Sequence, residues 1–270
     1  MNSDFVENKI WVLFRLLDNV YAISCDAVSS LFQLSNITPL PDYTNNVRGV
    51  IKYQQKIIQL LDIKKIFEIK TIEEEIKEFN ELISSRKQEY IDWFSKLEEK
   101  VTKNPELEII TDHANSDFGK WYNSYDSKKN NIMFLVTFKK FDEPHRALYG
   151  IAAEIEREIR HGDADKALEL FKRAKTKEFK QIISLFNELK NSFAESKKEI
   201  VIVFEGNNNF ISMAVDEIIA IEELGEFETE VLANTSMSSS YISGIAKRKN
   251  GDPVFVINHE EFLNQYSYLV

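Results

Sequence analysis

The hydrophobic pattern of this chain changes period twice, and the two changes limit the folds it can adopt. Residues 10–67 carry short runs of β-branched and aromatic residues, as β-strands do. From about residue 71 apolar residues recur at alternating steps of three and four, the spacing of amphipathic helices. After residues 197–199 the short alternating runs return. Because neither β segment alone provides a finished sheet, we predict an α+β fold in which a helical domain interrupts one β domain.

Turn signals divide the β segments into hairpins, at Asp18-Asn19, at residues 206–209 and at Asn250-Gly251. In the strand that follows the first of these turns, Tyr21, Ile23 and Cys25 share one face. Cys25 is therefore predicted to be a small core residue and not a reactive thiol.

Three apolar stripes lie within residues 71–197 and predict long helices with short connections, that is, a helical bundle. The first ends at Asn104-Pro105, the second ends at Gly162, and Asp163 begins the third. The stripes consist of Ile72, Ile76, Phe79, Ile83, Arg86, Tyr90, Trp93 and Leu97; of Phe134, Phe138, Phe141, His145, Leu148, Ala152, Ile155 and Ile159; and of Ala167, Phe171, Ile182, Phe186, Leu189 and Phe193.

The composition excludes several classes of protein. The net charge of -10 argues against non-specific nucleic-acid binding. A single cysteine excludes a disulfide framework and fits a reducing cytoplasm. We see no secretory signal and no apolar run long enough to span a bilayer, so a cytoplasmic protein without membrane insertion is expected.

The titratable residues form no convincing catalytic arrangement. There is no nucleophile elbow and no glycine-rich phosphate loop. Glu73, Glu74 and Glu75 fit the negatively charged start of a helix, and Asp112 and Asp117 fit helix capping. We therefore predict that the protein is not an enzyme.

Both β segments resemble the CheW-type chemotaxis adaptor domain, in a succession of stretches whose order and gaps also match. The matching stretches are FRLLDNVYAISCDAV, ITPLP, NNVRGVI and IIQLLDIKKIF before the helical segment, and IVIVFEG, MAVDEIIAIEEL and YISGIAKRKNGDPVFVINHEEFL after it.

The resemblance implies a CheW-like pair of packed, SH3-like five-stranded β-barrels, with residues 1–70 as the first half and residues 198–270 as the second. It also implies a non-catalytic adaptor that binds the regulatory domain of a histidine kinase and the cytoplasmic tip of a chemoreceptor. The partner-binding surface would include Ser30, Gly49, Val50, Gln54, Gln55 and Gly244.

This chain departs from the family pattern at two positions of that surface. Gln54 and Gln55 stand where the family usually has the Arg and Gly of an Asn-Leu-Arg-Gly sequence, and a glutamine provides neither the charge nor the planar fork of arginine. Ser30 stands where an acidic residue is usual, at the expected first helical turn after the second strand. Whether coupling would be activating or inhibitory is left open.

Residues 71–197 resemble the chemoreceptor zinc-binding domain, a small four-helix bundle. The matching stretches are TDHANSDFGKWY and FDEPHRALYGIAAEI, together with the tryptophan of EYIDWFSKL. In that family three histidines and one cysteine bind zinc. The corresponding positions here are Tyr90, Ser116, His145 and Tyr149, of which only His145 is a good ligand.

We therefore expect no zinc and no other cofactor, and predict that these four side chains satisfy one another by hydrogen bonding. Ser116 could also cap the helix that follows it. The stretch around Phe118 and Trp121 would then be the remnant of a metal site, retained for packing. The alternative is a metal- or ligand-responsive sensor whose insert regulates the adaptor domain.

Overall fold

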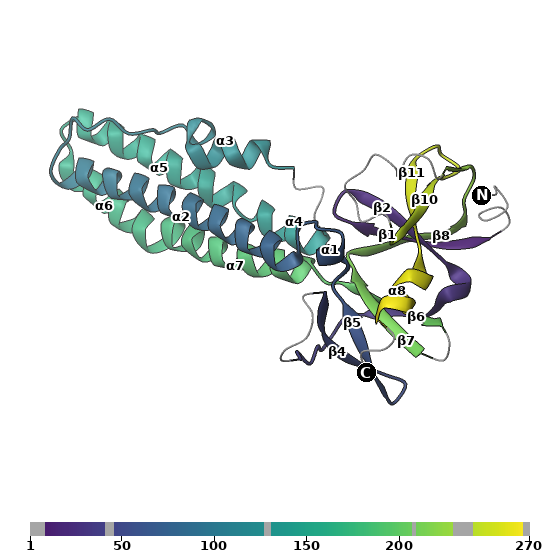
Figure 1. Cartoon of the computed structure of the whole chain (residues 1–270). Helices are drawn as coiled ribbons and strands as arrows, with labels where there is room; N and C mark the ends of the chain where they lie inside the picture. The colour runs from purple at the N-terminus through teal and green to yellow at the C-terminus, as the bar shows by residue number, and fades with distance from the viewer. Residues whose placement is uncertain (1–8, 41–45, 127–130, 207–208, 229–239, 267–270) are drawn as a thin grey trace. The chain divides into compact units, whose positions relative to one another are not determined.

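The computed structural model describes residues 9–40, 46–126, 131–206, 209–228 and 240–266, and the chain divides into two compact units (Figure 1). The β unit comprises Met1–Thr71 and Lys198–Val270, and the helical unit comprises Ile72–Lys197. Among the described residues, no helix is long and apolar enough to cross a membrane.

The β unit contains one six-stranded sheet and one five-stranded sheet. The family resemblance implied two SH3-like five-stranded barrels; the strand pairing gives one sheet of six strands and one of five, and closure of the sheets into barrels stays a prediction. In spatial order the first sheet consists of β8 (Glu217–Glu223), β1 (Ile10–Leu16), β2 (Asn19–Ser24), β11 (Pro253–Ile257), β10 (Ile242–Lys247) and β9 (Phe227–Glu228). The second consists of β3 (Val28–Gln33), β6 (Ile200–Gly206), β7 (Asn209–Val215), β5 (Lys56–Leu61) and β4 (Val47–Tyr53).

Each sheet takes strands from both sides of the helical unit in the sequence. In the first sheet, β1 pairs with β8 and β2 with β11; in the second, β3 pairs with β6 and β5 with β7. The β2–β11 and β5–β7 pairs are parallel, and the other two are antiparallel. The two sequence halves therefore build one structure, and neither sheet is complete without both.

Strand residues are buried on both faces of each sheet. Along β1, Val12 and Phe14 enter a core that also contains Ile202 and Phe204 of the second sheet, whereas Trp11 and Leu13 enter a separate core on the opposite face. The second sheet has its own core on the face away from the shared one. The residues directly after β5 form the short helix α1 (Ile63–Ile66) and not a further strand, because the Asp62 side chain accepts a hydrogen bond from the Lys65 amide.

Two ion pairs join the sequence halves within the β unit. Lys64 of α1 is almost fully buried, with its Nζ atom 2.7 Å from Oδ1 of Asp216, the residue between β7 and β8. Arg48 of β4 lies 2.6 Å from the carboxylate of Glu199, directly before β6. Lys64 and Glu199 are the buried members of these pairs, so removing Asp216 or Arg48 would leave a buried charge without its counterion, which is strongly destabilising. α8 (His259–Tyr266) completes the unit and contributes Phe262 to the shared core.

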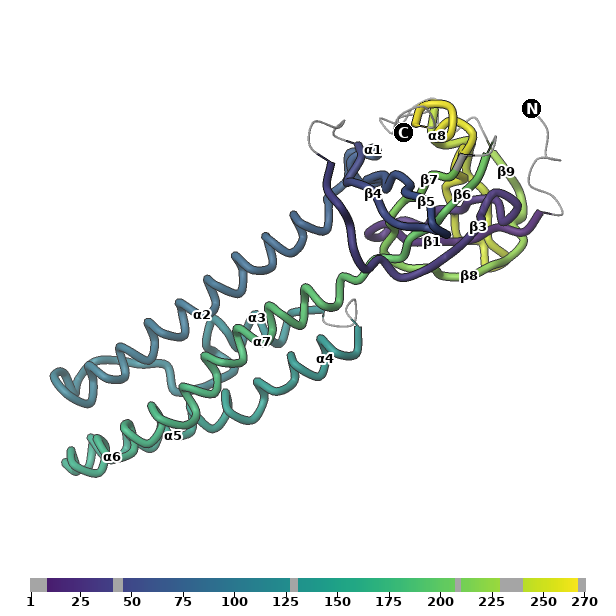
Figure 2. Tube along the Cα trace, turned by 90° about the horizontal axis from the view of Figure 1, so that it is seen from below, coloured from purple at the N-terminus to yellow at the C-terminus, as the bar shows by residue number. Residues whose placement is uncertain are grey.

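The helical unit consists of long helices that run side by side (Figure 2). α2 packs along α6 and α7, and α5 packs along α6. The helices are α2 (Ile72–Thr102), α3 (Asp117–Ser124), α4 (Ile132–Lys139), α5 (Asp142–Arg160), α6 (Ala164–Ala174) and α7 (Lys180–Ser196), with a short 3₁₀ turn at His113–Asn115 and a π-helical turn at Lys175–Phe179 that joins α6 to α7.

The second apolar stripe does not form one helix, because the chain breaks between α4 and α5. Lys140 and Phe141 lie between the two helices, and their amides bond to carbonyls only three residues back, Thr137 and Phe138. Pro144 follows in the first turn of α5, where its missing N–H costs no helical hydrogen bond. Gly162 ends α5 at φ +81°, and the Asp163 side chain caps α6, as the sequence predicted.

The two ends of the helical unit lie close together in space. The Nζ atom of Lys197, after α7, is 2.6 Å from the carboxylate of Glu75, in the first turn of α2. The unit therefore leaves and re-enters the rest of the chain at neighbouring points.

Candidate functional site

Tyr90, Ser116, His145 and Tyr149, the four sequence-predicted positions in the helical unit, are brought together by three helices. Tyr90 comes from α2, His145 and Tyr149 lie one turn apart on α5, and Ser116 is the N-cap of α3. All four side chains are buried.

A chain of hydrogen bonds runs through the His145 ring. The Tyr90 hydroxyl lies 2.7 Å from Nδ1, and the carbonyl oxygen of His113 lies 3.2 Å from Nε2. Because a carbonyl can only accept, Nε2 carries the proton and Nδ1 accepts from the tyrosine. His145 is therefore held as the neutral Nε2–H tautomer, with both ring nitrogens satisfied.

Burial keeps these groups uncharged near neutral pH. Burial lowers the pKa of His145 to about 4, although the His113 carbonyl opposes the shift. Burial raises the pKa of Tyr149 to about 12 against the opposing effect of the Ser116 side chain. The pKa of Tyr90 is raised well above its usual value, first by burial and then by Tyr149.

Ser116 holds the loop that carries His113. Its Oγ atom donates to the His113 carbonyl at 2.8 Å and accepts from the Gly119 amide at 2.9 Å, so the predicted cap of α3 is confirmed. A Cβ atom at Gly119 would lie 2.0 Å from the His113 carbonyl oxygen, so only glycine fits there. The role of this carbonyl was missed by sequence reasoning, because a backbone acceptor leaves no signal in the residue pattern.

Aromatic rings close the cluster on its remaining sides. Trp93 stacks on Tyr149 with ring centroids 4.2 Å apart, and Phe118 meets the His145 ring edge-on at 5.0 Å. Phe118 also contacts Trp121. A buried, aromatic environment of this kind favours neutral groups whose hydrogen bonds are all made.

The donor set does not fit a zinc ion. It provides one imidazole, two phenols and one hydroxyl, whereas structural zinc takes four nitrogen, sulfur or carboxylate ligands. Across the described part of the chain, no group of three or more His, Cys, Asp or Glu side chains is placed to hold a metal. The cluster is equipped for packing and hydrogen bonding and for no proton transfer near neutral pH.

The six positions of the predicted partner surface are spread over both sheets of the β unit. Ser30 lies in β3 and pairs with Val203 of β6, so the prediction that it occupies a helical turn is wrong. The turn after β2 is the 3₁₀ helix Cys25–Ala27, and the chain is extended again from Val28. Val50 lies in β4, at the opposite edge of the same sheet from β3.

Gln54 and Gln55 form the exposed tip of the β4–β5 hairpin. Their φ angles are 44° and 67°, so both central residues of this two-residue turn are left-handed, as in a type I′ turn. The Gln54 side-chain amide lies 3.0 Å from the Tyr53 hydroxyl. Because glutamine is uncharged, neither of the two central residues of the turn carries a charge.

The two glycines of the predicted surface are buried and serve backbone packing. A Cβ atom at Gly49 would lie 2.4 Å from the Thr38 carbonyl oxygen, and one at Gly244 would lie 2.6 Å from the Phe227 ring. Gly49 also has φ +150°, and Thr38 bonds to its neighbour Val50. Both positions require glycine for space.

Comparison with known proteins identifies the family. The family model of the CheW-like domain matches residues 11–91 and 179–267, which is more than half of the chain. The chain therefore belongs to the CheW-like domain family. This is a family of non-catalytic scaffolds and adaptors of chemotaxis, and the protein is accordingly an adaptor and not an enzyme.

Among solved structures, the chain is similar to the scaffolding protein TtCheW from Thermoanaerobacter tengcongensis. The identity is 13%, the alignment covers 93% of this chain and 84% of that chain, and the TM-score is 0.43. No curated protein matches the chain at a significant level.

Proposed function

We propose that the β unit is a cytoplasmic chemotaxis adaptor that links chemoreceptors to a histidine kinase, and that the helical unit is a metal-free insert within it. The observation that carries this proposal is the family match in two segments, residues 11–91 and 179–267, which cover most of the β unit and extend into both ends of the helical unit. The strand pairing supports it, because the two segments build both sheets jointly.

The test is calorimetry of the purified protein with two separate titrants, the regulatory domain of the kinase and the cytoplasmic tip of a receptor from the same organism. Small adaptor contacts have modest interface areas, so affinities in the micromolar range are expected. If neither titrant binds at high micromolar concentration, the adaptor proposal is wrong.

The hairpin tip allows a sharper version of this test. Gln54→Arg would restore the charge and the hydrogen-bonding fork that the family pattern has there, at an exposed position where the fold is not at risk. We expect binding of receptor tip or kinase domain to tighten about tenfold, the effect of one charged hydrogen bond. Gln54→Lys is the matched control: if it tightens binding equally, charge alone is responsible.

The same purified protein tests the insert. We expect substoichiometric zinc by elemental analysis, because one imidazole cannot hold the ion against buffer. Near-stoichiometric zinc would favour the alternative proposal, a metal-responsive insert that regulates the adaptor.

A further inference from the structure

Residues 105–112 connect the turn after α2 to the 3₁₀ turn at His113–Asn115 and contain no helix or strand (Figure 1). Their exposure alternates along the chain. The half-buried side chains include Leu107, Ile109 and Thr111, and the exposed ones include Glu106, Glu108 and Ile110. Ile109 packs against the core of the helical unit. We call residues 105–112 the strap.

The backbone of the strap makes few of the hydrogen bonds that hold helices and sheets. Among the residues that the structure describes, the amides of residues 108–113 donate to no protein acceptor. The Leu107 amide bonds to the Asn104 carbonyl, within the turn that follows α2. Because a backbone amide without a protein partner needs water, the strap depends on solvent for most of its amide hydrogen bonds.

Side chains of α2 and α5 hold the strap by donating hydrogen bonds to carbonyl oxygens along its length. Lys100 of α2 is 5% exposed, and its Nζ atom lies 2.9 Å from the Pro105 oxygen and 2.7 Å from the Leu107 oxygen. The Trp93 Nε1–H donates to the Ile110 oxygen at 2.9 Å. Directly after the strap, the Nε2–H of His145 donates to the His113 carbonyl. The strap is therefore fastened to helices by side chains and not by a backbone ladder.

We infer that the strap is a unit of local unfolding, which opens while α2 and α5 stay folded. Opening breaks its bonds to Lys100 and Trp93 and removes Ile109 from the core, but it breaks no hydrogen bond within a helix. Segments with few buried apolar contacts and a solvent-exposed backbone open at a lower free energy than the core of a protein.

Opening of the strap uncovers the buried cluster around His145. Trp93, which is bonded to the strap, stacks on Tyr149 of that cluster, and the carbonyl next to the strap is the acceptor for His145. In the open state both ring N–H groups lose these acceptors and meet solvent. The strap thus controls the access of water and small solutes to the cluster, and this role does not depend on the adaptor function of the β unit.

The test is native-state hydrogen exchange of the full chain, followed by NMR in urea below the unfolding transition. The Trp93 indole N–H reports opening of the strap, and the amides of Phe94 in α2 and Ile155 in α5 report unfolding of the helices. After correction for intrinsic rates, we expect the indole to exchange at least about a hundredfold faster than both amides. Its rate should depend only weakly on urea, because opening exposes little surface. One common rate with one urea dependence would overturn the inference.

A variant at the other end of the strap tests whether it opens as a unit. Lys100 bonds to the start of the strap, whereas Trp93 bonds near its end. Lys100→Met keeps the apolar stem and removes both bonds of the ammonium group. We expect it to speed exchange of the Trp93 indole about tenfold, the effect of one charged hydrogen bond, and to change the Phe94 and Ile155 amides much less. An unchanged indole rate, or an equal change at all three groups, would contradict opening of the strap as a separate unit.

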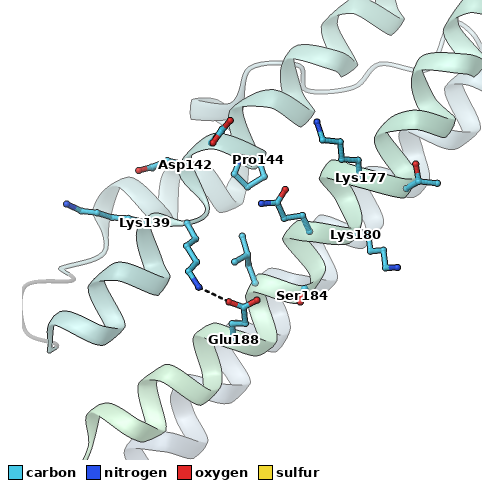
Figure 3. A pocket seen from close by; sticks show the side chains of 12 residues that line it. Lys139, Asp142, Pro144, Lys177, Lys180, Ser184 and Glu188 are labelled. Atoms are coloured by element: carbon cyan, nitrogen blue, oxygen red, sulfur yellow. Dashed lines mark hydrogen bonds and ion pairs between the residues drawn. The ribbon is translucent and has the colours of Figure 1, made fainter.

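The matched control is Lys140→Met, at a surface ion pair elsewhere in the helical unit. Lys140 lies 3.1 Å from Glu188, on a groove of about 780 Å³ that α4, α5 and α7 line (Figure 3). Both side chains are exposed, and exposed ion pairs contribute little to stability, so exchange of the Trp93 indole should change less than about twofold. If Lys140→Met speeds this exchange as much as Lys100→Met does, Lys100 does not hold the strap and the inference is wrong.

Discussion

At the scale of single residues, the tip of the β4–β5 hairpin is conformationally strained, because two non-glycine residues occupy its left-handed turn positions. Gln54 and Gln55 both adopt left-handed backbone conformations, which cost a non-glycine residue about 1 kcal/mol. The family resemblance places a glycine at the position of Gln55, and a glycine there would avoid this cost. Gln55 lies beside the residue that the proposed function makes most important.

Replacement of Gln55 by glycine should therefore stabilise the β unit. We expect Gln55→Gly to raise the free energy of unfolding by roughly 1 kcal/mol, because glycine adopts this conformation without a steric penalty. Urea denaturation measures the change. Gln33→Gly, in the extended strand β3, is the control and should have the opposite sign, since glycine weakens a strand.

His145 makes the helical unit sensitive to acid. Its pKa is about 4 in the folded state and 6.5 in an unfolded chain, so below pH 6.5 the unfolded state takes up the proton first. The contribution of neutral His145 to the free energy of unfolding is fully present above pH 6.5 and is lost as the pH falls toward 4. The total loss is at most about 3 kcal/mol.

The measurement is urea unfolding at pH 7, 5.5 and 4, followed by the fluorescence of Trp93 and Trp121 in a Trp11→Phe background. His145→Gln removes the titration, so the parent should lose more stability than this variant between pH 7 and 4. Parallel loss in the two proteins would show that His145 does not remain neutral in the folded state.

At the scale of helices and strands, the sequence predicted whether a segment is helical or extended better than it predicted where each element begins and ends. The period change identified the helical unit, and the turn at Asn250-Gly251 is found, with Gly251 at φ +88°. The break at Lys140 and Phe141 left no such signal, because the apolar stripe continues in register through it. The π-helical turn at Lys175–Phe179 was equally invisible, since no proline or glycine marks it. Ser30 was misplaced because the 3₁₀ turn after β2 is only three residues long.

The convergence of three helices on His145 predicts that a metal site can be rebuilt. Tyr90→His, Ser116→Cys and Tyr149→His together would supply three histidines and one cysteine around one point, a set that suits zinc. We expect the triple variant to bind one zinc and to melt at a higher temperature with zinc than without, because the ion binds only the folded state. The parent should show no such shift.

The control adds His145→Ala to the triple variant and should abolish zinc binding. The metal-free triple variant is expected to be less stable than the parent, since it loses two packed tyrosines and the Ser116 cap. A folded triple variant that purifies without zinc and melts identically in its presence would contradict the resemblance of the insert to a zinc-binding domain.

At the scale of the whole molecule, the helical unit should be dispensable for folding of the β unit. Its ends are joined by the Lys197–Glu75 ion pair, so a short linker can replace it without strain. Replacement of residues 72–197 by a Gly/Ser linker should leave a protein with β-type circular dichroism and one cooperative melting transition, because the entropic cost of a loop grows only logarithmically with its length.

The matched control for this deletion carries Lys64→Ala, which removes the buried lysine and its ion pair with Asp216. It should melt at a lower temperature than the deletion variant with Lys64 intact. A deletion variant with no cooperative transition would mean that the two sequence halves cannot assemble without the helices between them.

The shared construction of the two sheets has a consequence for biosynthesis. When the first 71 residues leave the ribosome, β1 and β4 have no complete sheet to join, because their sheets also need β6, β7, β8, β10 and β11. Translation of the helical unit, at about 5–20 residues per second, delays those strands by on the order of ten seconds. The helical unit can fold during this interval, whereas the apolar residues of the first strands stay exposed to chaperones. During synthesis, the incomplete β unit is therefore the part of this protein that is most prone to aggregate.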